Sequence, residues 1–355
     1  MILKFLERKL KRLLIKTLSK IFSPKRVTLE DLRKMSIKKI AVIRQDNRIG
    51  NLIFTIPLLE ALKEDYPLAE LNVITGYKFG EILGRVKVIN NIIPFHQRRA
   101  AVNPFYYFPF RKKLKNANYD LVIDAGSMTS LSTNNILIGT AAKSTAYVGY
   151  DRRESSKFLS HVVPPIDESR HESQQLLHLA NYIADKKREN YPSIKATDEE
   201  MREAEIALEK LDITSSDDII GMHVGGRYDK RWELNKFIEL ARELSSNGKK
   251  VIIFTGPDEA NLLHEMKLDK MQNVFHFQSV PIGLVIGLIS KCRVFITGDN
   301  GPLHIAAALG IPCVQIFKSD NYDRYGYTIK PHSVVMPIDP PYEKVLAIVR
   351  GSLYR

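Results

Sequence analysis

One segment decides the fold: Phe295-Ile-Thr-Gly-Asp-Asn-Gly-Pro-Leu-His-Ile-Ala-Ala-Ala-Leu-Gly310. Its apolar start predicts a buried strand, and Pro302 suits the first position of the helix that follows, where a backbone N–H is not needed. The N–H groups and partial positive charge of such a helix start favour a phosphate or diphosphate ligand. The predicted anion site comprises Asp299, Asn300, Gly301 and Pro302. We expect His304 in the first helical turn, facing the ligand, although a core histidine in an ordinary strand–loop–helix unit explains the same pattern.

Strand-like and helix-like stretches alternate along the chain in two series. Short apolar runs occupy residues 39–43, 71–75, 121–124 and 146–150, and then 219–224, 251–255, 274–277, 294–297 and 313–317. Such alternation predicts parallel sheets with helices on both faces. A chain of 355 residues that is 44% hydrophobic can bury two cores. We therefore expect an α/β protein with two Rossmann-like, doubly wound domains, whose sheets point their carboxyl ends at a central cleft.

A polar, proline-containing stretch from Ser155 to Glu205 separates the two series and places the domain boundary near Tyr191. The predicted parts are a basic helix over residues 1–26, one domain over 37–190, a second over 191–340 and a C-terminal helix over 341–355. Cys292 and Cys313 are the only cysteines, and both adjoin apolar strands. They predict neither a disulfide framework nor a metal site, so we expect a cytoplasmic protein.

The net charge of +13 is concentrated at the N-terminus, where residues 1–26 hold nine Lys and Arg residues against one Glu. Leu and Ile recur there every three or four positions, which predicts a basic amphipathic helix. Its apolar runs are too short for a membrane span or a secretory signal. We expect this helix to lie on an anionic membrane surface, with packing on its own protein or on a partner as the alternative. No nucleic acid is expected, because no DNA- or RNA-binding motif accompanies the charge.

A second basic block combines cations with aromatic rings. It reads His96-Gln-Arg-Arg and then Phe105-Tyr-Tyr-Phe-Pro-Phe-Arg-Lys-Lys113. The block is a candidate binding site for an amphiphilic, phosphorylated acceptor. The same aromatic residues would also serve as core residues of a long loop.

The loop after the first strand contains Asp46-Asn-Arg-Ile-Gly-Asn51, and Pro57 lies near the start of the helix that follows or bends it. Asp46 and Asn51 would both reach the space at the end of the strand. The loop matches neither the G-x-G-x-x-G pattern nor a P-loop, so tight dinucleotide or triphosphate binding is not expected here.

Two loops of the second domain add groups that suit a nucleoside diphosphate. In His223-Val-Gly-Gly-Arg-Tyr-Asp-Lys-Arg-Trp232, two glycines allow close approach of the backbone and two cations precede a helix. The residues concerned are Gly225, Gly226, Lys230 and Arg231. In Gly256-Pro-Asp-Glu259, the carboxylate of Glu259 lies where ribose hydroxyls are usually held, although a role near a helix N-cap would explain it equally.

Taken together, these segments resemble glycosyltransferase family 9, the bacterial ADP-heptose:lipopolysaccharide heptosyltransferases and their relatives. The resemblance covers nearly all of residues 37–320 and is strongest at 230–232, 256–259 and 298–310. It implies the GT-B architecture, with the acceptor on the N-terminal domain and the nucleotide sugar on the C-terminal one. It also implies that Glu259 holds the ribose. The residues implied for the sugar diphosphate are Lys230, Asp299, Asn300, Gly301 and His304.

The implied reaction is an inverting, metal-independent transfer of a sugar, with heptose expected, to a lipopolysaccharide core or related glycolipid. The enzyme would then work on the inner face of the inner membrane. Cations and helix N-termini would stabilise the departing diphosphate, with His304 as a possible donor. The chain has no Asp-x-Asp motif, so neither a metal nor a cofactor is expected. A nucleotide-sugar 2-epimerase and a non-catalytic sugar-nucleotide or glycan-binding protein are the alternatives.

The identity of the catalytic base is open. Many family members have Ile-Gly-Asp where this chain has Ile49-Gly50-Asn51, and that aspartate is taken as the base. Asn51 cannot accept a proton. We expect Asp46 to substitute, since a carboxylate shielded from water can have its pKa raised. A structural cap role for Asp46, another carboxylate as the base, and binding without turnover are the alternatives.

Overall fold

The computed structural model describes residues 17–353, except residues 18, 21, 23, 153, 227–230, 267, 269–270, 330–332 and 337–338. The chain divides between Tyr191 and Pro192 into two compact units. The predicted basic helix over residues 1–26 lies mostly outside the described residues, and so does Lys230. None of the helices described has the length and apolarity that a membrane crossing requires.

The first unit is built on a six-stranded sheet in the order β3-β2-β1-β4-β5-β6. Every pair of neighbouring strands is parallel. The strands are β1 (Lys39–Arg44), β2 (Glu70–Gly76), β3 (Asn91–Phe95), β4 (Leu121–Asp124), β5 (Ala146–Tyr150) and β6 (His161–Val163). Pro94 is tolerated in β3 because this strand is at the edge of the sheet.

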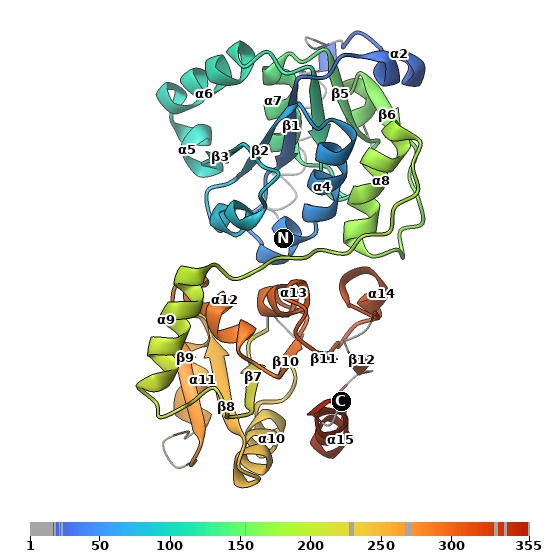
Figure 1. Ribbon diagram of the computed structural model, residues 1–355. Helices are drawn as coiled ribbons and strands as arrows, with labels where there is room; N and C mark the ends of the chain where they lie inside the picture. The colour runs from blue at the N-terminus through green and yellow to red at the C-terminus, as the bar shows by residue number, and fades with distance from the viewer. Residues whose placement is uncertain are drawn as a thin grey trace. The chain divides into compact units, whose positions relative to one another are not determined.

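Helices cover both faces of this sheet, with α4 and α8 on one face and α6 and α7 on the other (Figure 1). On the α6–α7 face, side chains of the central strands such as Ile43 and Val122 join Leu114 and Ile138 in one buried cluster. The helices are α2 (Leu29–Lys34), α3 (Ile49–Ile53), α4 (Ile56–Asp65), α5 (Gln97–Val102), α6 (Pro104–Asn116), α7 (Thr133–Ala142) and α8 (Glu172–Ala184), with 3₁₀ turns η1 (Gly80–Arg85) and η2 (Ser155–Lys157).

The second unit repeats this design with the sheet order β12-β11-β10-β7-β8-β9, again with all neighbours parallel. Its strands are β7 (Ile219–His223), β8 (Lys250–Thr255), β9 (Val274–Gln278), β10 (Val294–Gly298), β11 (Cys313–Ile316) and β12 (Ser333–Met336). Its helices are α9 (Asp198–Glu209), α10 (Leu234–Ser246), η4 (Pro257–Glu259), α11 (Ala260–Met266), α12 (Ile282–Ser290), α13 (Gly301–Ala308), α14 (Tyr322–Tyr325) and α15 (Tyr342–Leu353). A buried cluster joins α10 and α15 to the central strands.

In each unit the first strand is central, and the chain order reverses beside it. β1 pairs with β2 and β4, and β7 pairs with β8 and β10. In open α/β sheets, ligands bind beyond the carboxyl ends of the strands at such a reversal. The predicted α/β class with two doubly wound parallel sheets is confirmed.

The polar, helix-prone stretch between Ser155 and Glu205 contains β6 and α8 of the first unit and the start of α9 of the second. The edge strands β3, β6 and β12 are not among the apolar runs predicted as strands. β6 has only three residues and runs into Pro164, so its apolar signal is short.

Close helix packing in the second unit gives a test of the fold. A Cβ atom at Gly287 of α12 would lie 2.2 Å from the backbone oxygen of Glu200 in α9, so Gly287→Ala must push the two helices apart. We expect the substitution to lower the free energy of unfolding by about 1–3 kcal/mol, as overpacked cores do, measured by urea denaturation. The matched control is Gly351→Ala in α15, where a Cβ atom meets nothing within 4 Å. Equal unfolding midpoints for the two variants would contradict the packing described.

Candidate active site

Three loops of the second unit meet at the carboxyl ends of β7, β8 and β10. A Cβ atom at Gly225 would lie 2.5 Å from the Glu259 carboxylate oxygen Oε1 and 2.5 Å from His223 Cε1. The Asn300 Nδ2 group donates to the Gly225 carbonyl oxygen at 3.2 Å. Gly225, Glu259 and Asn300 are therefore neighbours in space, and a side chain at residue 225 would have to displace the Glu259 carboxylate.

Asn300 connects the loop after β10 to the loop after β7. Its Oδ1 accepts the Leu303 N–H at 3.3 Å and thereby caps α13. Its Nδ2 lies 3.0 Å from Nδ1 of His223, in addition to its bond to Gly225. The Thr297 hydroxyl is also within hydrogen-bond distance of this amide. An N-cap is worth about 1 kcal/mol, and here the capping side chain also fixes a neighbouring loop.

His223, the last residue of β7, is a buried histidine that sequence reasoning did not select. Burial lowers its pKa to about 4, so the ring is neutral near pH 7. Nδ1 accepts the Gly225 N–H at 3.2 Å. Nδ1 is therefore the unprotonated nitrogen, and the Asn300 amide donates to it.

His304 lies in the first turn of α13 and is buried, with its Nδ1 3.3 Å from the Tyr327 hydroxyl. Burial lowers the pKa of His304 to about 4, and nearby Asp299 opposes this only in part. Tyr327 is fixed by a reciprocal pair of bonds to Gln315. Its N–H donates to Gln315 Oε1 at 2.8 Å, and its carbonyl oxygen accepts from Gln315 Nε2 at 2.7 Å. His304 is thus a neutral hydrogen-bonding group near pH 7.

Glu259 ends the 3₁₀ turn η4, just beyond β8. Its Oε2 accepts the Gly256 N–H at 2.7 Å, and its Oε1 faces the Gly225 backbone. The side chain is half-buried. A carboxylate held in this way can accept hydrogen bonds from a pair of hydroxyl groups, such as a ribose diol.

The predicted Lys-Arg-Trp segment contains one residue with a core role. Trp232 is buried, donates from Nε1 to the Pro340 carbonyl oxygen at 2.9 Å, and packs edge-on against Phe237. Arg231 is half-buried, and its backbone lies against Gly226. Four further predicted donor-binding residues lie just before α13 or at its start. Asp299, Asn300, Gly301 and Pro302 are all partly exposed.

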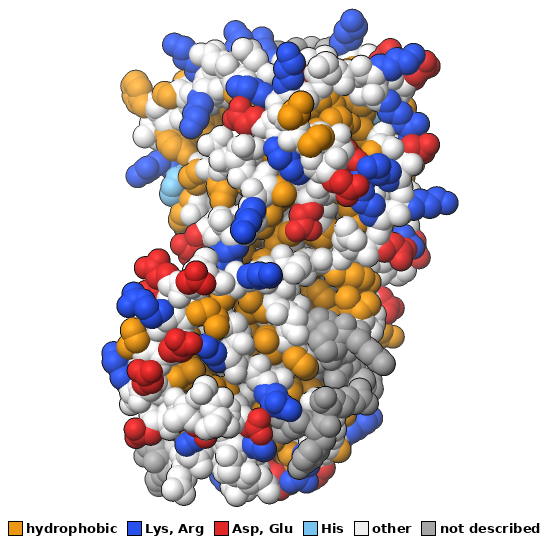
Figure 2. Space-filling model, viewed as in Figure 1, with side chains coloured by type: hydrophobic (Ala, Val, Ile, Leu, Met, Phe, Trp, Pro, Cys, Tyr) orange, Lys and Arg blue, Asp and Glu red, His pale blue; other side chains and the backbone are white. Residues whose placement is uncertain are grey.

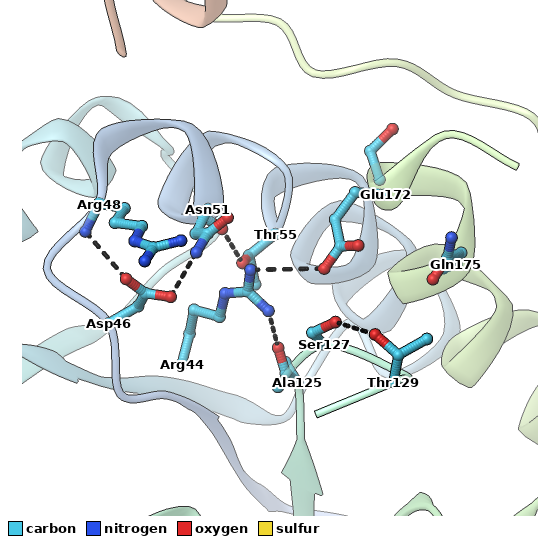
Figure 3. Close-up of polar contacts among 12 residues, drawn as sticks. Arg44, Asp46, Arg48, Asn51, Thr55, Ala125, Ser127, Thr129, Glu172 and Gln175 are labelled. Atoms are coloured by element: carbon cyan, nitrogen blue, oxygen red, sulfur yellow. Dashed lines mark hydrogen bonds and ion pairs between the residues drawn. The ribbon is translucent and has the colours of Figure 1, made fainter. Parts of the chain in front are cut away.

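In the first unit, Asp46 and Asn51 lie side by side (Figure 3). Asp46 Oδ1 accepts the Arg48 N–H at 3.0 Å, and Oδ2 accepts from the Asn51 side-chain amide. The Thr55 hydroxyl donates to the Asn51 carbonyl oxygen at 2.9 Å. The Asn51 amide therefore orients the only carboxylate in its own loop.

A buried arginine lies at the start of this loop. Arg44 closes β1, donates to the Ala125 carbonyl oxygen after β4, and lies 3.7 Å from the Glu172 carboxylate of α8 (Figure 3). A second buried pair, Arg152 with Asp124 at 2.7 Å, lies at the ends of β5 and β4. Removing one member of a buried ion pair typically costs about 3–5 kcal/mol.

Gly76 anchors the other side of the same loop. A Cβ atom there would lie 2.2 Å from Asn47 Oδ1 and 2.4 Å from the Asp46 carbonyl oxygen. The end of β2 can therefore touch the loop only because residue 76 lacks a side chain. The position of Asp46 is thus determined by backbone contacts as well as by Asn51.

The predicted catalytic residues fall in different units, Asp46 and Asn51 in the first and His304 in the second. Within the described parts of the chain, no group of three or more His, Cys, Asp or Glu side chains is arranged to hold a metal ion.

Comparison with known proteins gives consistent matches. The model of glycosyltransferase family 9 (heptosyltransferase) matches residues 107–346. Lipopolysaccharide heptosyltransferase 3 of Escherichia coli is 22% identical over 292 residues, which cover 77% of this chain and 82% of the relative. The glycosyl transferase family 9 structure from Veillonella parvula DSM 2008 has a TM-score of 0.80 at 18% identity, covering 89% of this chain and 97% of that one. E. coli ADP-heptose lps heptosyltransferase II has a TM-score of 0.74 at 20% identity, covering 89% and 98%.

His223 and His304, the buried histidines of the candidate site, predict how stability depends on pH. Their folded pKa of about 4 lies below the ordinary value of 6.5, so the unfolded chain binds more protons as the pH falls below about 6.5. The contribution of the neutral histidines to the free energy of unfolding is present above about pH 6.5 and is lost as the pH falls toward 4. From pH 7 to pH 5 we expect a loss of about 2 kcal/mol for each histidine.

The measurement is urea unfolding followed by the fluorescence of Trp232, the only tryptophan, which lies in the second unit. His304→Gln should remove the contribution of that histidine, about 2 kcal/mol between pH 7 and pH 5. The same loss in the variant and in the wild type would show that His304 is not the titrating group.

Proposed function

The chain belongs to glycosyltransferase family 9, and from this premise we propose that it transfers heptose from ADP-heptose to a lipopolysaccharide core or related glycolipid. The observation that carries the proposal is the meeting of Gly225, Glu259 and Asn300 at the reversal point of the second sheet. It supplies a carboxylate, a glycine backbone and a helix start within one small space. Helix starts and glycine backbones commonly bind phosphates, and carboxylates at such loops bind ribose hydroxyls.

In this proposal the start of α13 binds the diphosphate. Of the first helical N–H groups, Pro302 has none, and that of Leu303 is taken by Asn300. The helix start can therefore offer the amides of Asn300 and Gly301, together with its partial positive charge. Lys230 and Arg231 would add full positive charge as the nucleoside diphosphate leaves. These groups stabilise the negative charge of the departing nucleoside diphosphate without a metal.

Asp46 acts as the base in this proposal, and Asn51 orients it. The base removes the proton of the acceptor hydroxyl, whose oxygen attacks the anomeric carbon while the nucleoside diphosphate departs from the opposite face, which inverts the configuration. Support comes from the Asn51 amide, which holds one carboxylate oxygen of Asp46. The other oxygen accepts only a backbone N–H among the bonds described. His304 is neutral near pH 7 and serves as a hydrogen-bonding group near the diphosphate rather than as a cation.

We further propose that the protein works in the cytoplasm at the inner face of the inner membrane, held there by residues 1–26. Support comes from the net charge of +8 in that segment and from the names of the relatives, which are lipopolysaccharide enzymes. An acceptor anchored in a bilayer would be reached more readily by a protein attached to its surface.

The reaction itself is tested by release of ADP from ADP-heptose, with and without truncated lipopolysaccharide cores. A transferase releases ADP in step with modification of the core. Isomerisation of the donor alone would indicate an epimerase, and donor binding without any conversion would indicate a binding protein.

The donor site is tested by Glu259→Gln. Loss of the charged partner of the ribose should weaken ADP binding about tenfold to a hundredfold, measured by isothermal titration calorimetry. Glu239→Gln is the matched control, because Glu239 is an exposed carboxylate of α10 in the same unit. Equal affinity for ADP in both variants would remove Glu259 from the site.

The base is tested by Asp46→Asn, which keeps the size of the side chain and removes its charge. We expect kcat to fall about 10²- to 10⁴-fold while the affinity for ADP is unchanged. Asp185→Asn is the control, since Asp185 is an exposed carboxylate of the same unit and asparagine tolerates its left-handed φ of 56°. Retained turnover in Asp46→Asn would move the role of base to another carboxylate.

A further inference from the structure

One continuous segment of the first unit is strongly basic and contains none of the catalytic residues discussed above. Residues 82–119 contain eight Lys and Arg residues and no Asp or Glu. This segment and residues 1–26 each carry a net charge of +8, against +13 for the whole chain, so the rest of the chain is slightly acidic. The positive charge of the protein is therefore concentrated in these two segments.

The helices α5 and α6 divide the aromatic residues of this segment between two faces. Tyr106 and Phe110 pack toward the core against Phe95, with ring centroids 6.1 and 4.7 Å away. The Tyr106 hydroxyl accepts the His96 N–H at 2.9 Å. These rings are core residues, but of a helix rather than of a long loop.

The other face carries apolar and basic side chains that point to solvent. Val102, Phe105 and Phe108 are 83%, 89% and 59% exposed. Lys112 and Lys115 follow on the same side of α6, at intervals of three and four residues. We call these five residues the α5–α6 surface. Hydrophobic side chains with Lys and Arg beside them are visible where α5 and α6 lie (Figure 2).

This order of side chains matches the layers of a bilayer surface. Exposed phenylalanine rings on one or two helical turns can enter the boundary between headgroups and acyl chains. Lysines one or two turns further along would then lie among anionic headgroups, each adding to the attraction. With no acidic side chain in residues 82–119, the cations find no counter-charge within their own segment. An anionic lipid surface supplies that charge and covers the apolar rings together.

We infer that the α5–α6 surface is a membrane-contact site for anionic lipids, separate from residues 1–26. Val102, Phe105 and Phe108 insert at the headgroup boundary, and Lys112 and Lys115 bind lipid phosphates. The inference stands on exposure and charge and does not require the sugar-transfer reaction.

The test places a fluorescent reporter at the surface of the full-length protein. Phe105→Trp adds an exposed indole, while the native Trp232 is buried in the second unit and gives a constant background. Vesicles that mix phosphatidylcholine and phosphatidylglycerol in equal amounts should shift the emission of this variant to shorter wavelength, and lipids brominated on the acyl chains should quench it. Leu68→Trp is the matched control, since Leu68 is 98% exposed in the same unit but outside the α5–α6 surface. It should show neither effect.

Two results with these variants would overturn the inference. In the first, the Phe105→Trp variant sediments with the vesicles, but the brominated lipids do not quench its emission. The other is an emission shift that follows protein concentration without vesicles, which would assign the surface to a second copy of the chain.

Charge is tested separately by sedimentation with the same vesicles. The double variant Lys112→Glu/Lys115→Glu should bind about tenfold or more weakly than the wild type. The control Lys187→Glu/Lys195→Glu changes the net charge equally at exposed lysines elsewhere and should bind nearly normally. Equal weakening would show that only net charge matters and would overturn the site. Circular dichroism verifies that each variant is folded.

Discussion

Polar groups at the carboxyl ends of buried parallel strands must find hydrogen-bond partners away from water, and this constraint shapes both halves of the protein. The strands themselves are apolar on both faces, so any polar side chain near their ends is surrounded by the core. The first strand of each unit lies between two neighbours, and the loops that leave all three meet there. The same geometry that imposes the constraint also gathers the residues from which a site can be built.

The two units satisfy the constraint with different chemistry. In the first, buried ion pairs join Arg44 at the end of β1 to Glu172 of α8, and Arg152 after β5 to Asp124 at the end of β4. In the second, neutral groups do so, because His223 and the Asn300 amide bond to each other and to the Gly225 backbone. Among the described residues near the start of α13, the carboxylates of Glu259 and Asp299 are both half-buried, while the two histidines are neutral.

Much of this could be predicted from the sequence, because the deciding signals are local. Apolar runs of four to six residues define the central strands, and the segment from Phe295 to Gly310 gives a strand, a loop and a capped helix in order. The short edge strand β6 was missed because three residues carry too little pattern. The contact between Gly225 and Glu259 could not be predicted from the sequence either, because it depends on how two loops more than 30 residues apart come together. The same holds for Gly76, whose importance appears only in its contact with Asn47. His223 did have a local signal, as a polar residue that closes a buried strand.

Asn300 also has a consequence for how the protein tolerates substitution. Serine and threonine can also cap a helix, with a single hydroxyl. They lack the amide that here spans to the Gly225 carbonyl and to His223. Substitution of Asn300 by serine or threonine would preserve the cap of α13. It would remove the hydrogen bonds to His223 and to the Gly225 carbonyl oxygen. One amide side chain therefore couples the stability of α13 to the stiffness of the loop after β7.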